Sequence, residues 1–352
     1  MSITYGGDTI TDSNGGVLRP ISSVMRNRII NGAMVIDQRN AGASVTGNAG
    51  VYSLDRWGNF GTQTGKYTTQ QNAGSVTPPV GFTNYLGVTS SSAYSVVASD
   101  YFAPFQCIEG YNIADLNFGT ANAKTVTLSF WVRSSLTGTF GGAFCNIDFT
   151  RSYPFTYTIS SANTWEQKSV TIVGDTTGTW NTTNGRGLFV QFGIGVGSTY
   201  SGTAGSWASA YYASATGATS VVGTNGATFY ITGVQLEVGS SATGYEYRQY
   251  GQELALCQRY FEICNLTYTT YANGSNNVYA AYPFKVQKRA TPTMTNQGTS
   301  YGGYTITSLT LNSGAPDFSD NFSNVFQSVS SGGVNGAGMS RYATLLTASS
   351  EL

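Results

Sequence analysis

Short runs of alternating apolar and polar residues, separated by Gly, Asn, Ser, Thr and Pro, constrain this chain more than any other feature. In residues 125–133, Val126, Leu128, Phe130 and Val132 recur at every second position. A period of two is typical of a strand with one buried face. Strand-like runs recur at 84–89, 93–98, 155–159, 168–173, 187–196 and 228–238. Many such strands with Gly-rich turns, and no crossover helices for a parallel sheet, predict a mainly β chain folded as an antiparallel jelly-roll β-sandwich.

One segment departs from this pattern. In residues 251–264, Leu254, Cys257, Phe261 and Cys264 are spaced to lie on one face of a helix. We therefore expect one short helix that links two β regions. The predicted organisation is an N-terminal arm (1–26), a jelly roll (27–250), a linking helix (251–265) and a smaller C-terminal β domain (266–352).

Composition excludes several classes of function. The chain has 352 residues and no histidine, which removes His-based nucleophile systems and imidazole metal sites. Its 17 Lys and Arg balance its 17 Asp and Glu. Nucleic acids and anionic membrane surfaces need a basic protein surface, so we expect neither as a partner. No apolar run approaches the roughly 20 residues of a membrane span, so we expect no membrane insertion.

The four cysteines indicate a reducing environment during synthesis. Cys107, Cys145, Cys257 and Cys264 show no CxxC spacing, and a shared helix would hold Cys257 and Cys264 too far apart for a disulfide. We expect four buried free thiols. The first residues lack the basic and apolar regions of a signal peptide, so we expect synthesis in a cytoplasm.

Three stretches of the chain form recognisable motifs. The first is Asn27-Arg28-Ile29-Ile30-Asn31-Gly32 with Gln38-Arg39 and Asp55-Arg56-Trp57, the second is Lys124–Val132 with Thr164-Trp165-Glu166, and the third is Val234-Gln235-Leu236-Glu237 with Thr243, Tyr245-Glu246-Tyr247-Arg248 and 253–260. Together they resemble bacteriophage tail-fibre and related virion proteins that carry a carbohydrate-binding-like jelly roll. The segment Phe284–Thr293 and the ending Glu351-Leu352 also resemble such fibres. The resemblance implies a virion setting, a homotrimer and attachment to other virion proteins through the N-terminal arm.

Residues 176–214 have the composition that glycan recognition needs, with aromatic rings among amides and hydroxyls. We take Trp180, Trp207, Tyr211 and Tyr212 as candidate glycan contacts. The alternative is that these aromatics pack locally under long loops or against a neighbouring subunit. Trp131 and Trp165 lie in strand-like contexts, and we expect structural roles for both.

Nothing in the sequence indicates catalysis. Glycoside hydrolysis needs two positioned carboxylates, and no recognisable motif pairs the acids near the expected loops, which are Glu109, Asp115, Asp148, Glu166 and Asp175. The segment Asp8–Gly15 lacks the bidentate Glu of a calcium loop. We therefore predict no enzyme activity, no metal site and no cofactor. The basic residues Lys285, Lys288 and Arg289 are expected on a solvated strand edge.

These observations predict a structural phage virion protein, a tail fibre or receptor-binding adhesin that contacts host surface polysaccharide during adsorption. We expect it in the virion, on the tail rather than the capsid. The first alternative is a capsid fibre or decoration protein with no receptor role. The second is a polysaccharide depolymerase.

Overall fold

The computed structural model describes residues 25–271, 277–296, 308–311, 322–328 and 339–352, together with the short strands β1 (Thr4–Tyr5) and β2 (Asp8–Thr9). The chain forms two compact units: an N-terminal unit of Met1–Gln249 with Leu352, and a C-terminal unit of Tyr250–Glu351. Apart from β1, β2 and residues 25–26, the predicted arm 1–26 lies outside the described residues. Its role in particle attachment stays a prediction.

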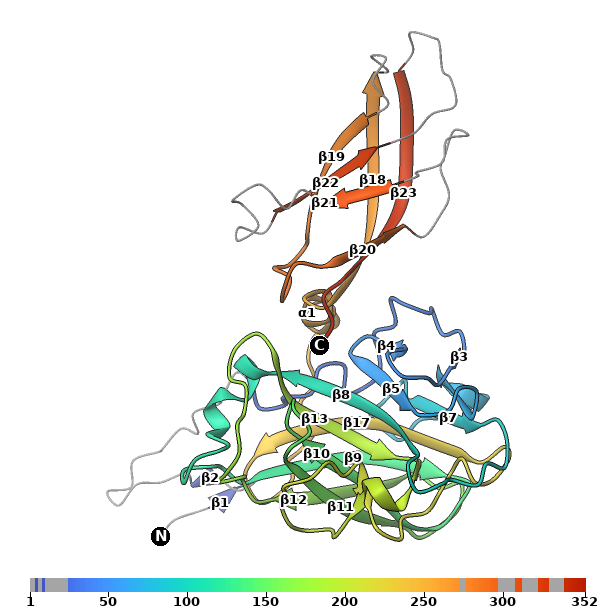
Figure 1. Cartoon of the computed structure of the whole chain (residues 1–352), viewed down its shortest axis with the longest axis vertical. Helices are drawn as coiled ribbons and strands as arrows, with labels where there is room; N and C mark the ends of the chain where they lie inside the picture. The colour runs from blue at the N-terminus through green and yellow to red at the C-terminus, as the bar shows by residue number, and fades with distance from the viewer. Residues whose placement is uncertain are drawn as a thin grey trace. The chain divides into compact units, whose positions relative to one another are not determined.

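Two sheets form the N-terminal unit (Figure 1). The seven-stranded sheet contains, in spatial order, β11 (Ser152–Ile159), β10 (Gly138–Cys145), β13 (Arg186–Gly193), β8 (Tyr101–Glu109), β5 (Trp57–Gly61) and β4 (Tyr52–Leu54), and β14 (Gly195–Val196) pairs with β8. The six-stranded sheet contains β12 (Glu166–Ile172), β9 (Val126–Ser134), β17 (Thr228–Val238), β7 (Leu86–Ser90), β6 (Tyr67–Gln71) and β3 (Val45–Thr46). The pairings within both sheets are antiparallel, and the predicted jelly-roll β-sandwich is confirmed.

Shorter elements connect these strands. They are the 3-10 helices η1 (Ala73–Ser75), η2 (Gly110–Asn112), η3 (Ala114–Leu116) and η4 (Ser198–Tyr200), and the parallel pair β15 (Ser201–Gly202) and β16 (Ser214–Ala215).

The core lies between the two sheets and follows the predicted alternation. On β9, Val126, Leu128, Phe130 and Val132 are at most 1% exposed. The Phe130 ring meets that of Phe192 from β13 in the other sheet, with 5.0 Å between centroids. Each such side chain stabilises the fold by roughly 1.5–3 kcal/mol through removal from water.

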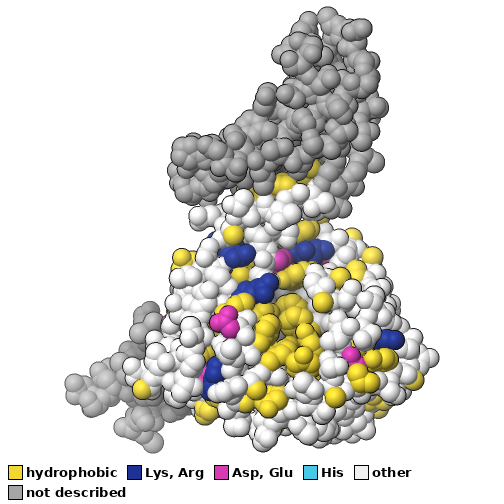
Figure 2. Space-filling model, in the orientation of Figure 1, with side chains coloured by type: hydrophobic (Ala, Val, Ile, Leu, Met, Phe, Trp, Pro, Cys, Tyr) yellow, Lys and Arg dark blue, Asp and Glu magenta, His cyan; other side chains and the backbone are white. Residues whose placement is uncertain are grey.

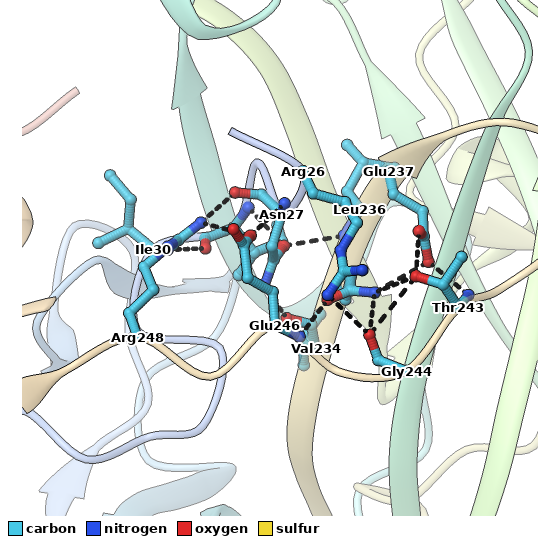
Figure 3. A network of polar contacts seen from close by, with 12 residues as sticks. Arg26, Asn27, Ile30, Val234, Leu236, Glu237, Thr243, Gly244, Glu246 and Arg248 are labelled. Carbon is cyan, nitrogen blue, oxygen red and sulfur yellow. Dashed lines mark hydrogen bonds and ion pairs between the residues drawn. The ribbon is translucent and has the colours of Figure 1, made fainter. Parts of the chain in front are cut away.

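A network of polar contacts explains why motifs at the two ends of this unit occur together (Figure 3). The Asn27 backbone N–H donates to Glu246 Oε2 (2.6 Å), and its side-chain Oδ1 accepts from the backbone N–H of Leu236 (3.1 Å). The Arg248 guanidinium donates to the carbonyl oxygens of Asn27 and Ile29. We call this network, formed by residues 26–32, 234–237 and 243–248, the terminal latch. Residues of the first and third sequence motifs are thus bonded to each other in one network.

The rest of the first motif fixes a left-handed turn. Asn31 has φ of 57°, and its side chain bonds the backbone N–H and carbonyl of Ile36 (3.0 and 2.8 Å). Gln38 donates twice to the Asp55 carboxylate, from its backbone N–H (2.7 Å) and from Nε2 (2.8 Å). Trp57 donates its indole N–H to the Asn31 carbonyl (3.0 Å). The residues of this motif therefore have a structural role, because their hydrogen bonds hold the turn in place.

The Arg28–Asp115 pair gives a test of stability against pH. Arg28 donates to both carboxylate oxygens of Asp115 at 2.5 and 2.7 Å, and these bonds hold the pKa of Asp115 below its usual range. A carboxyl with a lowered folded pKa contributes stability above its unfolded pKa, and this contribution is lost as the pH falls through the folded value.

We expect Asp115→Asn to lower the thermal midpoint by about 1–3 °C near pH 7, because the carboxylate is half exposed and screened by solvent. The difference from wild type should shrink as the pH falls from 7 towards 2, because Asp115 gains a proton first in the unfolded and then in the folded state. Calorimetry at both pH values measures it. Asp148→Asn, the same change on an exposed side chain, is the control. An equal effect of Asp115→Asn at both pH values would contradict this account.

The described residues of the C-terminal unit form two three-stranded sheets and one helix. One sheet contains β18 (Phe261–Tyr271), β23 (Met339–Ser349) and β20 (Thr293–Asn296), and the other contains β19 (Asn277–Pro283), β22 (Phe322–Ser328) and β21 (Ser308–Leu311). Helix α1 (Tyr250–Gln258) is shorter than predicted, since residues from Phe261 onward form β18 and pair with β23. The apolar spacing of 254–264 thus belongs to a helix followed by a strand.

The basic segment of this unit corrects an expectation. The Lys288 side chain is only 5% exposed, and its Nζ lies 2.6 Å from Oε2 of the fully buried Glu262. It also donates to the Gln258 carbonyl at the end of α1 (2.5 Å). Lys285 is more than half exposed, as predicted, but it lies with Lys288 and Arg289 between β19 and β20 and not on a strand edge. Lys288 instead joins the end of the helix to β18.

All four cysteines are buried free thiols, as expected. Cys257 lies in α1 and Cys264 in β18, so the expectation of a shared helix was wrong. Within the described part of the chain, no helix is long and apolar enough to cross a membrane.

Candidate functional site

The seven-stranded sheet carries a continuous set of aromatic rings on the face turned away from the core. On β8, Phe102 and Ile108 enter the core, so the alternating residues Tyr101 and Phe105 point to the other side. Strand β13 contributes Phe189 next to them. We call the connected set the outer aromatic network; it consists of Tyr52, Phe60, Tyr101, Phe105, Phe149, Phe189, Tyr200 and Tyr211.

The rings contact one another without interruption. Phe60 stacks on Phe105 with 4.1 Å between centroids and 19° between planes. Tyr211 lies 4.5 Å from Phe149 and 5.6 Å from Tyr101. Such pairs add about 0.5–1.5 kcal/mol each beyond the burial of their surface. The network is therefore a firm surface rather than a set of independent side chains.

The rings of the outer aromatic network fall into two layers by their solvent exposure: a buried floor and a partly exposed layer above it. Phe105 and Phe189 are 5% and 2% exposed and form the floor. The other six rings keep part of their surface accessible to solvent. Figure 2 shows apolar side chains gathered over the β8 and β13 face, with charged side chains around them. A contiguous apolar patch with a polar rim marks a binding surface.

Local backbone features place two of these rings. Gly58 leaves room for Phe105, since a Cβ at position 58 would lie 2.7 Å from the end of that ring. Phe149 has φ of 52°, a conformation rare for a bulky residue that costs about 1–3 kcal/mol. The buried Asn146 side chain supports this turn by accepting from the backbone N–H groups of Thr150 (2.9 Å) and Arg151 (3.0 Å).

Polar groups adjoin the network. The Tyr211 hydroxyl donates to Gln191 Oε1 (3.3 Å), and the Arg186 guanidinium lies 6.0 Å from the Phe189 ring centre. Burial raises the pKa of both Tyr101 and Tyr211 above the ordinary value. Both phenols are therefore protonated at neutral pH, and their hydroxyl groups can donate as well as accept.

Two of the four predicted glycan contacts, Trp180 and Trp207, lie outside the outer aromatic network. Trp180 and Trp207 meet edge to face at 5.4 Å and share a cluster with Phe118 and Tyr153. Trp180 is only 8% exposed, so little of its ring is accessible. Trp207 is half-buried, and its indole N–H donates to the Val173 carbonyl (2.7 Å). Their local packing matches the alternative considered for this segment, and a glycan-binding role for either stays a prediction.

Tyr211 and Tyr212, although adjacent, have different surroundings. Tyr211 belongs to the outer aromatic network, whereas the Tyr212 ring packs over Gly202, where a Cβ would lie 2.3 Å from it. The structure thus brings one of the four predicted residues into the network. Phe60, Tyr101 and Phe149 were missed; the alternation within 101–109 was the signal available for Tyr101.

Three of the acids considered for catalysis form ion pairs instead. Asp115 pairs with Arg28, Glu166 with Lys168, and the buried Asp175 with Arg151, whose Nη2 lies 2.7 Å from Oδ1. No group of three or more Cys, Asp or Glu side chains in the described part of the chain is placed to hold a metal ion.

Comparisons with known proteins concern the fold alone. The chain matches no protein-family model and no curated protein. It is similar to the enzymatically active domain of tailspike protein 4 from bacteriophage CBA120, at 12% identity and a TM-score of 0.33, over 60% of this chain and 21% of that one. A putative sugar binding protein from Bacteroides thetaiotaomicron matches at 11% identity and a TM-score of 0.36, over 61% of this chain and 100% of that one. A family 11 carbohydrate-binding module from Clostridium thermocellum matches at 13% identity and a TM-score of 0.28, over 58% of this chain and 99% of that one.

Proposed function

We propose that this chain is a non-catalytic phage virion protein that binds host surface glycan through the outer aromatic network. The observation that carries the proposal is the continuity of the network, in which six partly exposed rings rest on a buried aromatic floor. A sugar ring has an apolar C–H face that packs on an aromatic ring, and hydroxyl groups that need donors and acceptors beside it. Tyr101, Tyr211 and Arg186 supply these polar groups, while the buried Gln191 holds the Tyr211 hydroxyl in place.

The virion setting rests on the sequence motifs that resemble those of tail-fibre proteins. Under this proposal the chain is a tail fibre or adhesin, assembled as a homotrimer and attached through the N-terminal arm. A millimolar sugar site is worth only about 4 kcal/mol. Several copies on one particle would raise avidity by about 10²–10⁴, which suits adsorption without chemical turnover.

The double variant Phe60→Ala/Tyr211→Ala tests the site. We expect it to weaken glycan binding at least about 10-fold, since truncating central aromatic contacts typically costs more than 1 kcal/mol each. The first measurement is a bacterial-surface glycan array, followed by calorimetric titration with the strongest oligosaccharide. Tyr111→Ala removes an exposed tyrosine outside the network and is the control.

An architectural role is the second candidate, because exposed apolar patches also form contacts between subunits. In that case wild type would bind no glycan on the array, and Phe60→Ala/Tyr211→Ala would lower the oligomer mass in sedimentation. A depolymerase would release new reducing or unsaturated ends from host polysaccharide. Either outcome would overturn the glycan-binding proposal in its present form.

A further inference from the structure

Tyr211 belongs to the outer aromatic network without standing on a strand of the sheet. Phe60 and Tyr101 stand on β5 and β8, whose pairing in register fixes their positions. Tyr211 lies between β15 and β16, where the chain is irregular. Its ring nevertheless lies 4.5 Å from that of Phe149 and 5.4 Å from that of Tyr200. Contacts other than a strand ladder must therefore hold the Tyr211 backbone in place.

Ser152, the first residue of β11, holds the backbone on both sides of Tyr211. Its Oγ donates to the Ala210 carbonyl (2.7 Å) and accepts from the backbone N–H of Tyr212 (3.1 Å). The Ser152 backbone also pairs with Ala208, donating to its carbonyl (3.1 Å) and accepting from its N–H (2.8 Å). One hydroxyl group thus fixes the residue before and the residue after the aromatic ring.

These bonds are made away from solvent. Tyr153 and Phe155 enter the core, so the alternation of β11 turns Ser152 to the outer face of the sheet. Ser152 is nevertheless 0% exposed, as the bonded segment 208–212 lies over it. A serine hydroxyl can donate one hydrogen bond and accept others, and Ser152 does both. Without the hydroxyl, the Ala210 carbonyl and the Tyr212 N–H lose this partner, which favours a rearranged backbone around Tyr211.

We propose that Ser152 is a positioning residue for glycan binding, whose hydroxyl keeps the Tyr211 ring in its place before the ligand arrives. The inference rests on the proposed function. Because Ser152 is fully buried, it acts through Tyr211 and does not touch the glycan. A contact side chain that is already ordered loses less conformational entropy when the ligand binds, so the affinity is higher.

The substitution Ser152→Ala removes the hydroxyl and should leave the rest of the segment attached. The backbone pairing of residue 152 with Ala208 remains, and Arg151 Nη1 still donates to Ser209 Oγ (2.8 Å). We therefore expect Ser152→Ala to fold, with the loss of order confined to the chain around Tyr211. Urea unfolding of each variant checks this.

The test measures binding of the strongest oligosaccharide of the bacterial-surface array by calorimetric titration. We expect Ser152→Ala to weaken binding about 3- to 10-fold. The matched control is Ser214→Ala, because Ser214 is only 1% exposed and its hydroxyl has no hydrogen-bond partner within the described part of the chain. The control should bind as tightly as wild type. In a Tyr211→Ala background, Ser152→Ala should have no further effect, since the ring that it positions is absent.

A spectroscopic measurement follows the ring itself. In ¹⁹F NMR of fluorotyrosine-labelled protein, the Tyr211 signal is identified by its loss in Tyr211→Phe. We expect this signal to broaden or shift in Ser152→Ala and to stay unchanged in Ser214→Ala. An unchanged Tyr211 signal in Ser152→Ala would show that other contacts hold the ring, and would overturn the inference.

The binding outcomes separate this inference from the proposed function. If wild type and Ser152→Ala bind glycan equally tightly, the positioning role is overturned while the proposed function stands. If Ser152→Ala weakens binding as much in the Tyr211→Ala background as in wild type, Ser152 does not act through Tyr211 and the inference falls. If wild type binds no glycan, the proposed function falls and the positioning role falls with it.

Discussion

The substitution Gly32→Ala is expected to lower the free energy of unfolding of the N-terminal unit by about 4 kcal/mol, which is among the largest effects of a single added methyl group. A Cβ at Gly32 would lie 2.1 Å from the Val234 carbonyl oxygen and 3.1 Å from the Tyr245 hydroxyl. The first contact is with backbone, so no side-chain rotation relieves it. Either the chain around residue 32 or β17 must move.

That movement disturbs bonds that hold the terminal latch. The Val234 backbone N–H donates to the Gly32 carbonyl (3.0 Å), and the Val234 carbonyl accepts from Asn27 Nδ2 (3.2 Å). Buried polar groups that lose their partners add about 1–3 kcal/mol each to the steric cost. The expected loss therefore combines a clash with broken hydrogen bonds.

Urea unfolding followed by tryptophan fluorescence measures this effect, because all five tryptophans lie in the N-terminal unit. The matched control is Gly244→Ala, in the same latch, where no atom lies within 4 Å of the place that a Cβ would take. We expect the control to change the free energy of unfolding by less than about 0.5 kcal/mol. Equal stability of the two variants would show that the latch accommodates a methyl group at residue 32.

In the C-terminal unit, the substitution Glu262→Gln is expected to lower the free energy of unfolding by about 3–5 kcal/mol. The substitution leaves the buried Lys288 ammonium without its carboxylate partner at 2.6 Å. Burial already lowers the pKa of Lys288, and the hydrogen bond from Glu262 opposes that shift. Without Glu262 the lysine must either stay charged in an apolar setting or lose its proton.

Two further variants identify the cause. The double replacement Glu262→Leu/Lys288→Met should recover most of the lost stability, since a well-packed apolar pair often equals a buried ion pair. The Lys285 ammonium lies 4.0 Å from the same carboxylate, but the side chain is more than half exposed. Lys285→Ala should therefore lower the free energy of unfolding by less than about 1 kcal/mol. Far-UV circular dichroism follows both units, while tryptophan fluorescence should stay unchanged. A Glu262→Gln protein as stable as Lys285→Ala would refute the role of this pair.

The β-sandwich could be predicted because its signal is local. Alternation in 125–133 requires only that one face of a strand be buried, and the apolar side chains at 126, 128, 130 and 132 of β9 all lie in the core. The end of helix α1 could not, because residues from Phe261 pair with Ser349 and its neighbours, a partner far along the chain. Over a segment this short, the apolar spacing of a helix and the alternation of a strand cannot be told apart. Pairing of these residues with β23 decides that they form a strand.

The candidate site was harder to predict because its rings come from separate strands. Phe60, Phe105 and Phe189 meet only when β5, β8 and β13 have paired in register. Nor did composition show that Phe118 and Tyr153 would pack against the tryptophans of 176–214. Turn-rich sequence indicated where aromatics gather, but neighbours distant in the chain decide which rings remain accessible.

The terminal latch has a consequence for how the protein is made. It joins Asn27 to Glu246, 219 positions apart, so it cannot close until the ribosome has released nearly all of the N-terminal unit. Contacts between such distant residues slow folding, since the chain must lose much of its freedom before they form. Residues 26–32 therefore wait for their latch partners through most of translation, about 10–40 s at 5–20 residues per second, whereas β3 to β6 can already pair with strands made before residue 110.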